Sequence, residues 1–240
     1  LIKMRSSGML LDFQPERNPY DTFILRVTGS DGSQYYLDGG SPHGYINVLP
    51  PDLLVTNARL VRPNVPGEWV DLTRLTRNGT TMTVATTLTD DLRLSGEYTC
   101  KETGNTSYST KESYSESDDE QDYISEIETD LAIEIDDITF GQMKEYSSSS
   151  QTEYKFHKDL DASGDFVYIN PFLVKFHSAD TFQSLQREFP IDFPFTYSLT
   201  YIFTFTIPEG YAVDQIPENR IFKFQPLAST ARCSCTVNGN

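Results

Sequence analysis

The sequence predicts a mainly-β fold, an antiparallel β-sandwich that carries one or two short helices. Three observations predict it. Apolar and polar residues alternate with a period of two over much of the chain, as in strands with one buried face. Groups of Gly, Asn, Asp, Ser and Pro separate these stretches, as turns do between strands. A clear helical period occurs in one stretch.

The clearest predicted strand covers residues 197–207. Its aromatic and aliphatic residues alternate with Ser and Thr, and it stops at the turn signal Pro208-Glu209-Gly210. Turn chemistry is also found at Ser30-Asp31-Gly32, at Asn78-Gly79, which we interpret as a hairpin turn, and at Ser163-Gly164. The other predicted strands are 23–28, 34–37, 81–88, 132–140, 154–157, 166–170, 221–224 and 232–237.

One helix is predicted to begin at Ser117, which can cap a run of acidic residues that suits the positive end of the helix dipole. Its apolar residues then share one face: Tyr123, Ile124, Ile127 and Leu131. A shorter helical turn is expected over residues 179–186. The four serines at 147–150 predict a loop.

Charge limits the partners that the chain can have. Its 240 residues include 19 Lys or Arg and 35 Asp or Glu, a net charge of −16. Such a surface repels phosphate groups, so we expect no nucleic acid partner and no electrostatic docking on anionic lipid. No apolar run approaches the roughly 20 residues of a transmembrane helix. Because the chain starts at Leu1, we expect it to begin partway through a longer gene product.

A series of segments carries a family resemblance. The most specific segment is PIDFPFTYSLTYIFTFTIPEGY, residues 190–211. Together, the segments resemble the C-terminal β-domain that follows a transglutaminase-like core in large bacterial envelope proteins. The other segments are GEWVDL (67–72), LRLSGEYTC (92–100), DDEQDYISEIETDLAIEI (118–135), GDFVYINPFLVKF (164–176) and CTVNGN (235–240).

The N-terminal piece resembles the end of the transglutaminase-like core itself. In that family a histidine lies in a sequence like NHVI, and an aspartate lies in one like YLLDAT. Residues 21–24 (DTFI) fall on the first motif and residues 36–40 (YLDGG) on the second. Asp38 therefore matches the family aspartate, whereas Thr22 stands at the histidine position. The resemblance implies a partial core of a few strands over residues 1–62 and an accessory β-sandwich over residues 63–240.

The replacement at Thr22 has a chemical consequence. A cysteine nucleophile needs a nearby base, and a threonine hydroxyl does not titrate near neutral pH. The resemblance thus implies a non-catalytic C-terminal fragment of a cell-envelope or periplasmic protein, which needs no cofactor and acts as a scaffold or binding module for an envelope protein or glycan. Two alternatives stay open. The chain is the C-terminal half of an active cysteine acyl transferase or protease whose nucleophile lies upstream of Leu1, or a degenerate core that binds peptides without cutting them.

Other polar residues give weaker signals. His43 follows Asp38 by five residues and is a candidate for the vacant base, although a loop histidine is the favoured interpretation. His157 and His177 show no ligand spacing. Residues 116–137 contain eleven acidic and no basic residues, which favours a solvated helix face over a calcium site. Residues 159–164 imitate the start of a calcium loop but lack its flanking helices and its final acid, so no metal site is predicted.

Two further features complete the predictions. Cys233 and Cys235 share one strand face and are expected to be buried, with a disulfide from Cys100 to either of them left open. Phe193, Phe195 and Tyr197 are candidates for a ligand groove, with plugging of the sandwich end as the favoured alternative. A severed core sheet exposes strand edges, so residues 1–50 should pair with the sandwich, with another copy, or with a missing part of the protein.

Overall fold

The computed structural model describes residues 1–8, 17–89, 91–173, 186, 192–224 and 229–238. The helical elements are η1 (Arg5–Ser7), η2 (Pro51–Leu53), α1 (Asn105–Glu116) and α2 (Glu120–Leu131). The strands are β1 (Leu25–Thr28), β2 (Gln34–Leu37), β3 (Ala58–Arg62), β4 (Val65–Val70), β5 (Gly79–Leu88), β6 (Arg93–Thr103), β7 (Glu134–Gly141), β8 (Ser149–Asp159), β9 (Ala162–Ser163), β10 (Phe166–Val167), β11 (Ser198–Thr206), β12 (Arg220–Phe224) and β13 (Ser229–Cys233).

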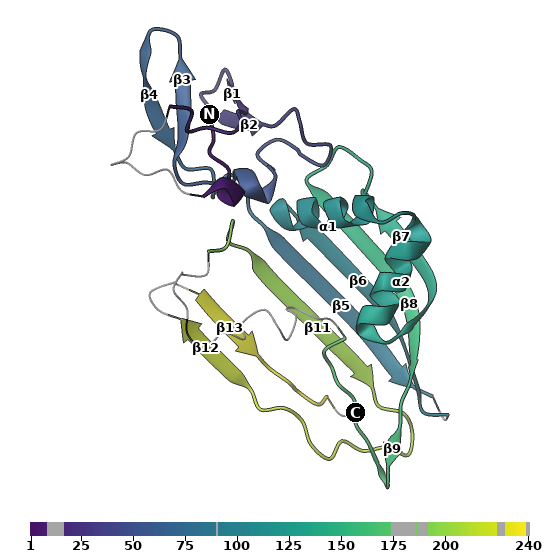
Figure 1. The fold of residues 1–240 in the computed structure, drawn as a ribbon. Helices are drawn as coiled ribbons and strands as arrows, with labels where there is room; N and C mark the ends of the chain where they lie inside the picture. Colours follow the sequence, from purple (N-terminus) through teal and green to yellow (C-terminus); the bar gives the residue numbers. More distant parts are fainter. Residues whose placement is uncertain (9–16, 90, 174–185, 187–191, 225–228, 239–240) are drawn as a thin grey trace.

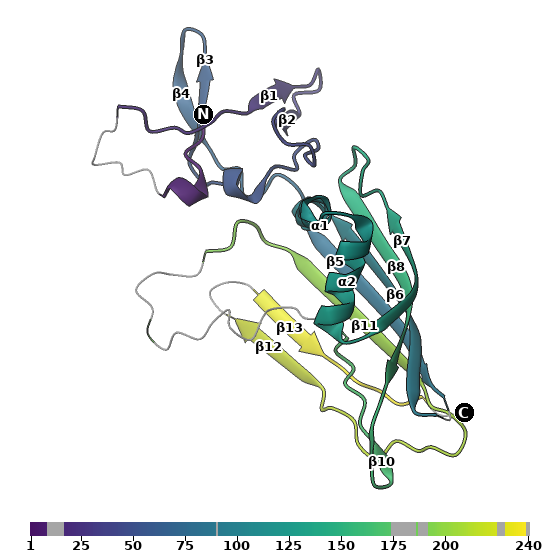
Figure 2. The same ribbon diagram turned by 45° about the vertical axis from the view of Figure 1, so that its right-hand side comes forward.

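The architecture is mainly β, as the sequence predicts. A five-stranded sheet with the order β11-β5-β6-β8-β7 forms its centre, and α1 and α2 lie across one face of this sheet (Figure 1). Two small hairpins, β1–β2 and β3–β4, lie beyond one end of the sheet. The hairpin β12–β13 lies beside β11, on the side of the sheet away from β7, in both views (Figures 1 and 2).

The large sheet is helix-covered on one face and polar on the other. The covered face carries Val84, Tyr98, Tyr154 and Phe156, and the rings of Tyr98 and Tyr154 stack at 4.4 Å. The alternate positions of β5, beginning with Thr81, are exposed. Helices, rather than a second sheet, therefore provide the cover that a sandwich would require. The described residues form two buried cores, and the one under the helices is called the second core. It consists of Val84, Leu94, Tyr98, Cys100, Ile133, Tyr154, Phe156 and Leu173.

A separate core holds the N-terminal segment together. Tyr36 of β2 contributes to it, as does Leu72, which lies beyond the boundary expected at residue 62. That boundary falls in the turn between β3 and β4, so the division into two domains stays a prediction. The members of this first core are Ile2, Tyr36, Leu49, Leu53, Leu54, Val55, Ala58 and Leu72.

One strand of the sheet departs from the expected antiparallel arrangement. β11 pairs in parallel with β5, with Ser198 opposite Gly79 and Thr206 opposite Thr87. The other pairs in the sheet are antiparallel. Periodicity predicts that residues 197–207 form a strand but contains no information on its direction, because direction depends on how the preceding segment crosses the molecule.

Helix α2 confirms the predicted helix and moves its start. Its cap is Asp119, whose carboxylate accepts the Asp122 backbone N–H at 2.9 Å. Ser117 instead follows the last residue of α1 as its C-cap, which corrects its predicted role. Ile127 and Leu131 pack against the second core, as their spacing predicts. The helical turn expected over 179–186 falls almost entirely outside the described residues.

Several elements escape prediction, among them the strands β3, β4 and β6 and the helix α1. Helix α1 reads NTSYSTKESYSE and buries polar residues such as Ser107 and Lys111. Strand β6 is interrupted in sequence by Gly96, where a side chain would lie 2.7 Å from the Ala85 carbonyl oxygen. The glycine thus permits close packing inside a strand. The expected serine loop is also shorter, because β8 already begins at Ser149 and buries Ser150.

A buried amide pair joins the N-terminal segment to the sheet. Asn78 Oδ1 accepts the backbone N–H of Asn105 at 2.7 Å, and Asn78 Nδ2 donates to the Thr196 carbonyl at 3.0 Å. Asn105 Nδ2 donates to the Leu49 carbonyl at 2.6 Å. Asn78-Gly79 is therefore not a hairpin turn: Gly79 opens β5, and the Asn78 side chain satisfies the first N–H of α1.

Candidate functional site

Asp38 and Thr22 lie at the same end of the β1–β2 hairpin. β1 and β2 pair with Leu25 opposite Leu37, so Asp38 follows the hairpin at the end where Thr22 precedes it. The Asp38 carboxylate accepts the Gly40 N–H at 3.0 Å. Thr22 forms an isolated bridge with Ile2. The proposed correspondence of these two residues with a family triad stays a prediction.

His43 turns toward helix α1 rather than into a triad with Asp38. Its Nε2 lies 2.9 Å from Ser115 Oγ, and its ring meets the Tyr108 ring edge-on at 6.2 Å. Ser115 Oγ donates its one proton to the Glu112 carbonyl at 2.8 Å. With that proton directed to the carbonyl, Ser115 Oγ accepts from His43 in the tautomer that carries its proton on Nε2.

Tyr108 connects this cluster to the Asp38 loop. Ser41 Oγ donates to its hydroxyl at 3.2 Å, and the hydroxyl donates to Glu112 Oε1 at 3.2 Å. Burial raises the pKa of Tyr108, and the nearby charges of Glu112 and Asp38 raise it further. The phenol stays protonated at neutral pH, and its hydrogen bonds link the Asp38 loop to α1.

A pocket of about 430 Å³ opens beside His43, between α1, the start of α2 and the segment before β8. Lys111 lines it and is 1% exposed, with its ammonium donating to the Glu145 and Ser147 carbonyls at 3.2 and 2.7 Å. Burial lowers the pKa of Lys111. Its hydrogen bonds tie the segment before β8 to α1, so the residue has a structural role here.

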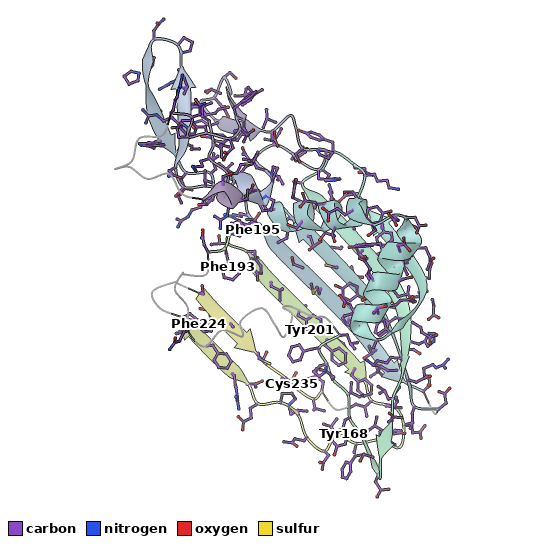
Figure 3. The ribbon with its side chains drawn as sticks, viewed as in Figure 1. Tyr168, Phe193, Phe195, Tyr201, Phe224 and Cys235 are labelled. Atoms are coloured by element: carbon purple, nitrogen blue, oxygen red, sulfur yellow. The ribbon has the colours of Figure 1, made fainter. Side chains whose placement is uncertain are left out.

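The three aromatic candidates differ in burial, and the rings of Phe195 and Tyr197 meet edge-on at 6.4 Å. Phe195 packs against the first core, whereas Phe193 and Tyr197 are 55% and 45% exposed. Figure 3 shows Phe193 and Phe195 in the connection that leads into β11, at the end of the sheet nearest the N-terminal hairpins. One of the three thus plugs the end of the sheet, as the favoured alternative expects, and two face solvent.

The hairpin β12–β13 is an exposed surface that sequence reasoning missed. All ten of its residues are exposed. Its register places Phe222 opposite Ala231 and Phe224 opposite Ser229, which gives one apolar face. Lys223 and Arg232 lie on the opposite face. One signal was available in the sequence: residues 219–240 contain three basic and no acidic residues in an otherwise acidic chain.

Cysteines and carboxylates form no metal centre in the described part of the chain. There, no group of three or more His, Cys, Asp or Glu side chains is placed to hold a metal ion. All three cysteines are free. Cys100 is buried, but Cys233 is exposed and Cys235 is half-buried, which corrects the expectation that this pair is buried. Asp159 of the imitated calcium loop pairs with Arg93 at 2.8 Å.

His157 lies in an acidic setting on the open face of the sheet. Its Nδ1 lies 3.0 Å from Asp136 and its Nε2 lies 3.1 Å from Glu134, both on or next to the bulge of β7. The hydrogen bond that His157 donates to Asp136 raises the pKa of His157. His177 lies outside the described residues.

Comparison with known proteins gives one match. Residues 165–240 match the model of a family described as a Domain of Unknown Function with solved-structure structure (DUF3858). The match covers less than half of the chain and includes β10, β11 and the exposed hairpin β12–β13. No curated protein and no solved structure matches the chain at a significant level. Among the described helices, none is long and apolar enough to cross a bilayer.

Proposed function

We propose that this chain is a non-catalytic scaffold or binding module, the C-terminal part of a transglutaminase-like protein of the cell envelope or periplasm. The observation that carries the binding role is the exposure of the segment matched by the family model. In the described part of the chain, no apolar side chain after Leu173 is fully buried, although Phe195, Tyr201, Phe203 and Phe205 are partly buried against the two cores. Phe222 and Phe224 are 48% and 52% exposed on one face of β12–β13.

An exposed apolar face next to basic side chains fits a protein or glycan partner. Aromatic side chains provide contact area with sugars or apolar side chains, and Arg220, which shares the face of Phe222 and Phe224, provides positive charge in a segment without acidic residues. Contiguous apolar patches on a soluble surface mark interaction sites. The hairpin is therefore the surface on which a partner would dock.

The geometry around Asp38 supports the absence of catalysis in this chain. Asp38 accepts a hydrogen bond from Gly40, and the Nε2 atom of His43 is occupied by its contact with Ser115 Oγ. Thr22 provides no replacement base.

The test is a binding screen of the full chain against immobilised envelope glycans and peptides. The double variant Phe222→Ser and Phe224→Ser should lose binding to the retained ligand class by at least about tenfold. Tyr211→Ser, which removes an exposed aromatic residue (45%) outside the hairpin, is the matched control and should bind as the parent does. Circular dichroism confirms that both variants fold. Failure of the parent to bind any ligand, or equal loss in both variants, would contradict the proposal.

A further inference from the structure

The pocket of about 430 Å³ beside His43 is built from four separate segments of the chain. They are the loop that contains Pro42 and His43, the end of α1, the start of α2 and the segment between β7 and β8. Hydrogen bonds connect these walls: Lys111 of α1 donates to the Glu145 carbonyl, and His43 Nε2 lies 2.9 Å from Ser115 Oγ. The cavity is therefore formed before any ligand arrives, which lowers the ordering cost of binding.

Tyr114 of α1 supplies an aromatic ring to this pocket. The ammonium of Lys144 lies over that ring, 5.6 Å from its centroid, so a cation is already seated at the ring face. The rings of Tyr123 and Phe140 pack against Tyr114 at 5.2 and 5.1 Å and fix its orientation. The Tyr114 hydroxyl donates to Glu120 at 2.7 Å. The chain's own primary ammonium group thus marks a place for a cation in the pocket.

Lys144 is held loosely at this place. The residue is exposed, and its ammonium forms no ion pair with the residues that the structure describes. A cation over an exposed ring gains little free energy, and a lysine side chain regains rotamer freedom when it is released into water. Lys144 can therefore turn out to solvent and leave the ring face to the ammonium group of a ligand.

The charge of the lining favours a ligand with more than one cation. Four carboxylates line the pocket against two ammonium groups, and none of the four forms an ion pair with a described residue. In the described part of the chain no carboxylates are gathered closely enough to hold a metal ion, so these four suit an extended organic cation. They belong to Asp118, Asp119, Glu120 and Glu145. Asp119 caps α2 and Glu120 accepts the Tyr114 hydroxyl, which leaves Asp118 and Glu145 for a ligand.

We propose that this pocket binds a ligand with at least two primary ammonium groups on a flexible chain, a linear polyamine or a pair of lysine side chains in a peptide. One ammonium takes the place of Lys144 over Tyr114, and a second one pairs with the carboxylates of Asp118 and Glu145. The segment after β7 lines the pocket, whereas the hairpin β12–β13 lies beside β11 at the opposite edge of the sheet (Figure 1). The two sites are separate, so this proposal stands or falls independently of the proposed function.

The first test is isothermal titration of the full chain at low salt with two probes. Spermidine represents the free polyamine, and the acetylated, amidated peptide Gly-Lys-Gly-Lys-Gly represents a peptide ligand, with Gln in place of Lys in its neutral control. We expect one saturable site for at least one of the two probes, and at least about tenfold weaker binding of the control. Tighter binding of spermidine assigns a free polyamine and tighter binding of the peptide assigns a protein partner. No saturable binding of either probe overturns the proposal.

Removal of the resident lysine is the sharper test. Lys144→Gln should raise the affinity for the probes at least about threefold more than Lys101→Gln does, because it frees the ring face. Lys101 is an exposed lysine of β6, so its variant removes the same charge elsewhere. Tyr114→Leu should lower the affinity about three- to fivefold, because the ring is lost. Circular dichroism checks that the variants fold, and Lys144→Gln decides the test if Tyr114→Leu does not.

Three results would contradict the proposal even if the probes bind. Equal changes in Lys144→Gln and Lys101→Gln would show only a general attraction to an acidic chain, and so would an unchanged affinity in a folded Tyr114→Leu variant. Displacement of the bound probe by an equal concentration of calcium ions would assign the carboxylates to a metal ion instead.

Discussion

The strands of the large sheet and the C-terminal hairpin have similar sequence patterns but differ in burial. β5, β6 and β8 alternate polar and apolar residues and bury one face under α1 and α2. β12 also alternates, with Phe222 and Phe224 on one face, yet all of its residues are exposed. Alternation makes a strand amphipathic but does not provide a partner for its apolar face. Four measurements test how far the buried and exposed regions differ.

The largest difference is expected between two phenylalanines. Phe156 of β8 is 2% exposed and touches the stacked tyrosines of the core, so Phe156→Ala should lower the free energy of unfolding by about 3–5 kcal/mol. Phe222→Ala in the exposed hairpin should change it by no more than about 0.5 kcal/mol. Urea unfolding of both variants measures this. Similar losses for the two would show that the hairpin is packed in solution.

Cysteine reactivity probes the same contrast. Burial, with a further contribution from Glu102, raises the pKa of the Cys100 thiol to about 12. At pH 8 its thiolate fraction, and thus its rate with a thiol reagent, should be roughly a thousandfold below that of an ordinary cysteine. Exposed Cys233 should react quickly. Reaction of the single-cysteine variants, followed by absorbance, tests this prediction, and fast labelling of Cys100 in the folded chain would refute it.

The junction between the N-terminal segment and the sheet is the next target. Asn78→Ala leaves the first N–H of α1 and the Thr196 carbonyl without their partner in a buried site. We expect a loss of about 1–3 kcal/mol in the free energy of unfolding. Asn219→Ala is a control in an exposed segment, where the lost bond to the Cys235 N–H should matter less. Equal effects would mean that the junction does not stabilise the fold.

The smallest effect concerns the pH dependence of β7. Because the hydrogen bond to Asp136 raises the pKa of His157, the folded value lies above the unfolded value of about 6.5. The stabilisation is full below the unfolded pKa and is lost as pH rises through the folded pKa. Asp136→Asn should lower the pKa of His157 in an NMR titration, whereas Asp137→Asn should change it less. A pKa that does not move in Asp136→Asn would show that this contact is absent in solution.

The sequence determined the elements with strong local patterns. Apolar alternation places β11, and the spacing of Ile127 and Leu131 gives the buried face of α2. The charge signal in residues 219–240 is likewise present in the sequence. These features follow from the period of the backbone and from side-chain polarity, which act within a few residues.

Other features of the fold depend on tertiary contacts that no local sequence pattern predicts. α1 is a helix without an apolar stripe, and the side chains of Asn105 and Lys111 are buried because the Leu49 carbonyl and the segment before β8 accept their hydrogen bonds. Gly96 is a strand residue because neighbouring strands approach it closely. His43 contacts Ser115, which lies 72 positions away in the sequence. Parallel pairing of β11 with β5 likewise depends on contacts between distant segments, which no local pattern contains.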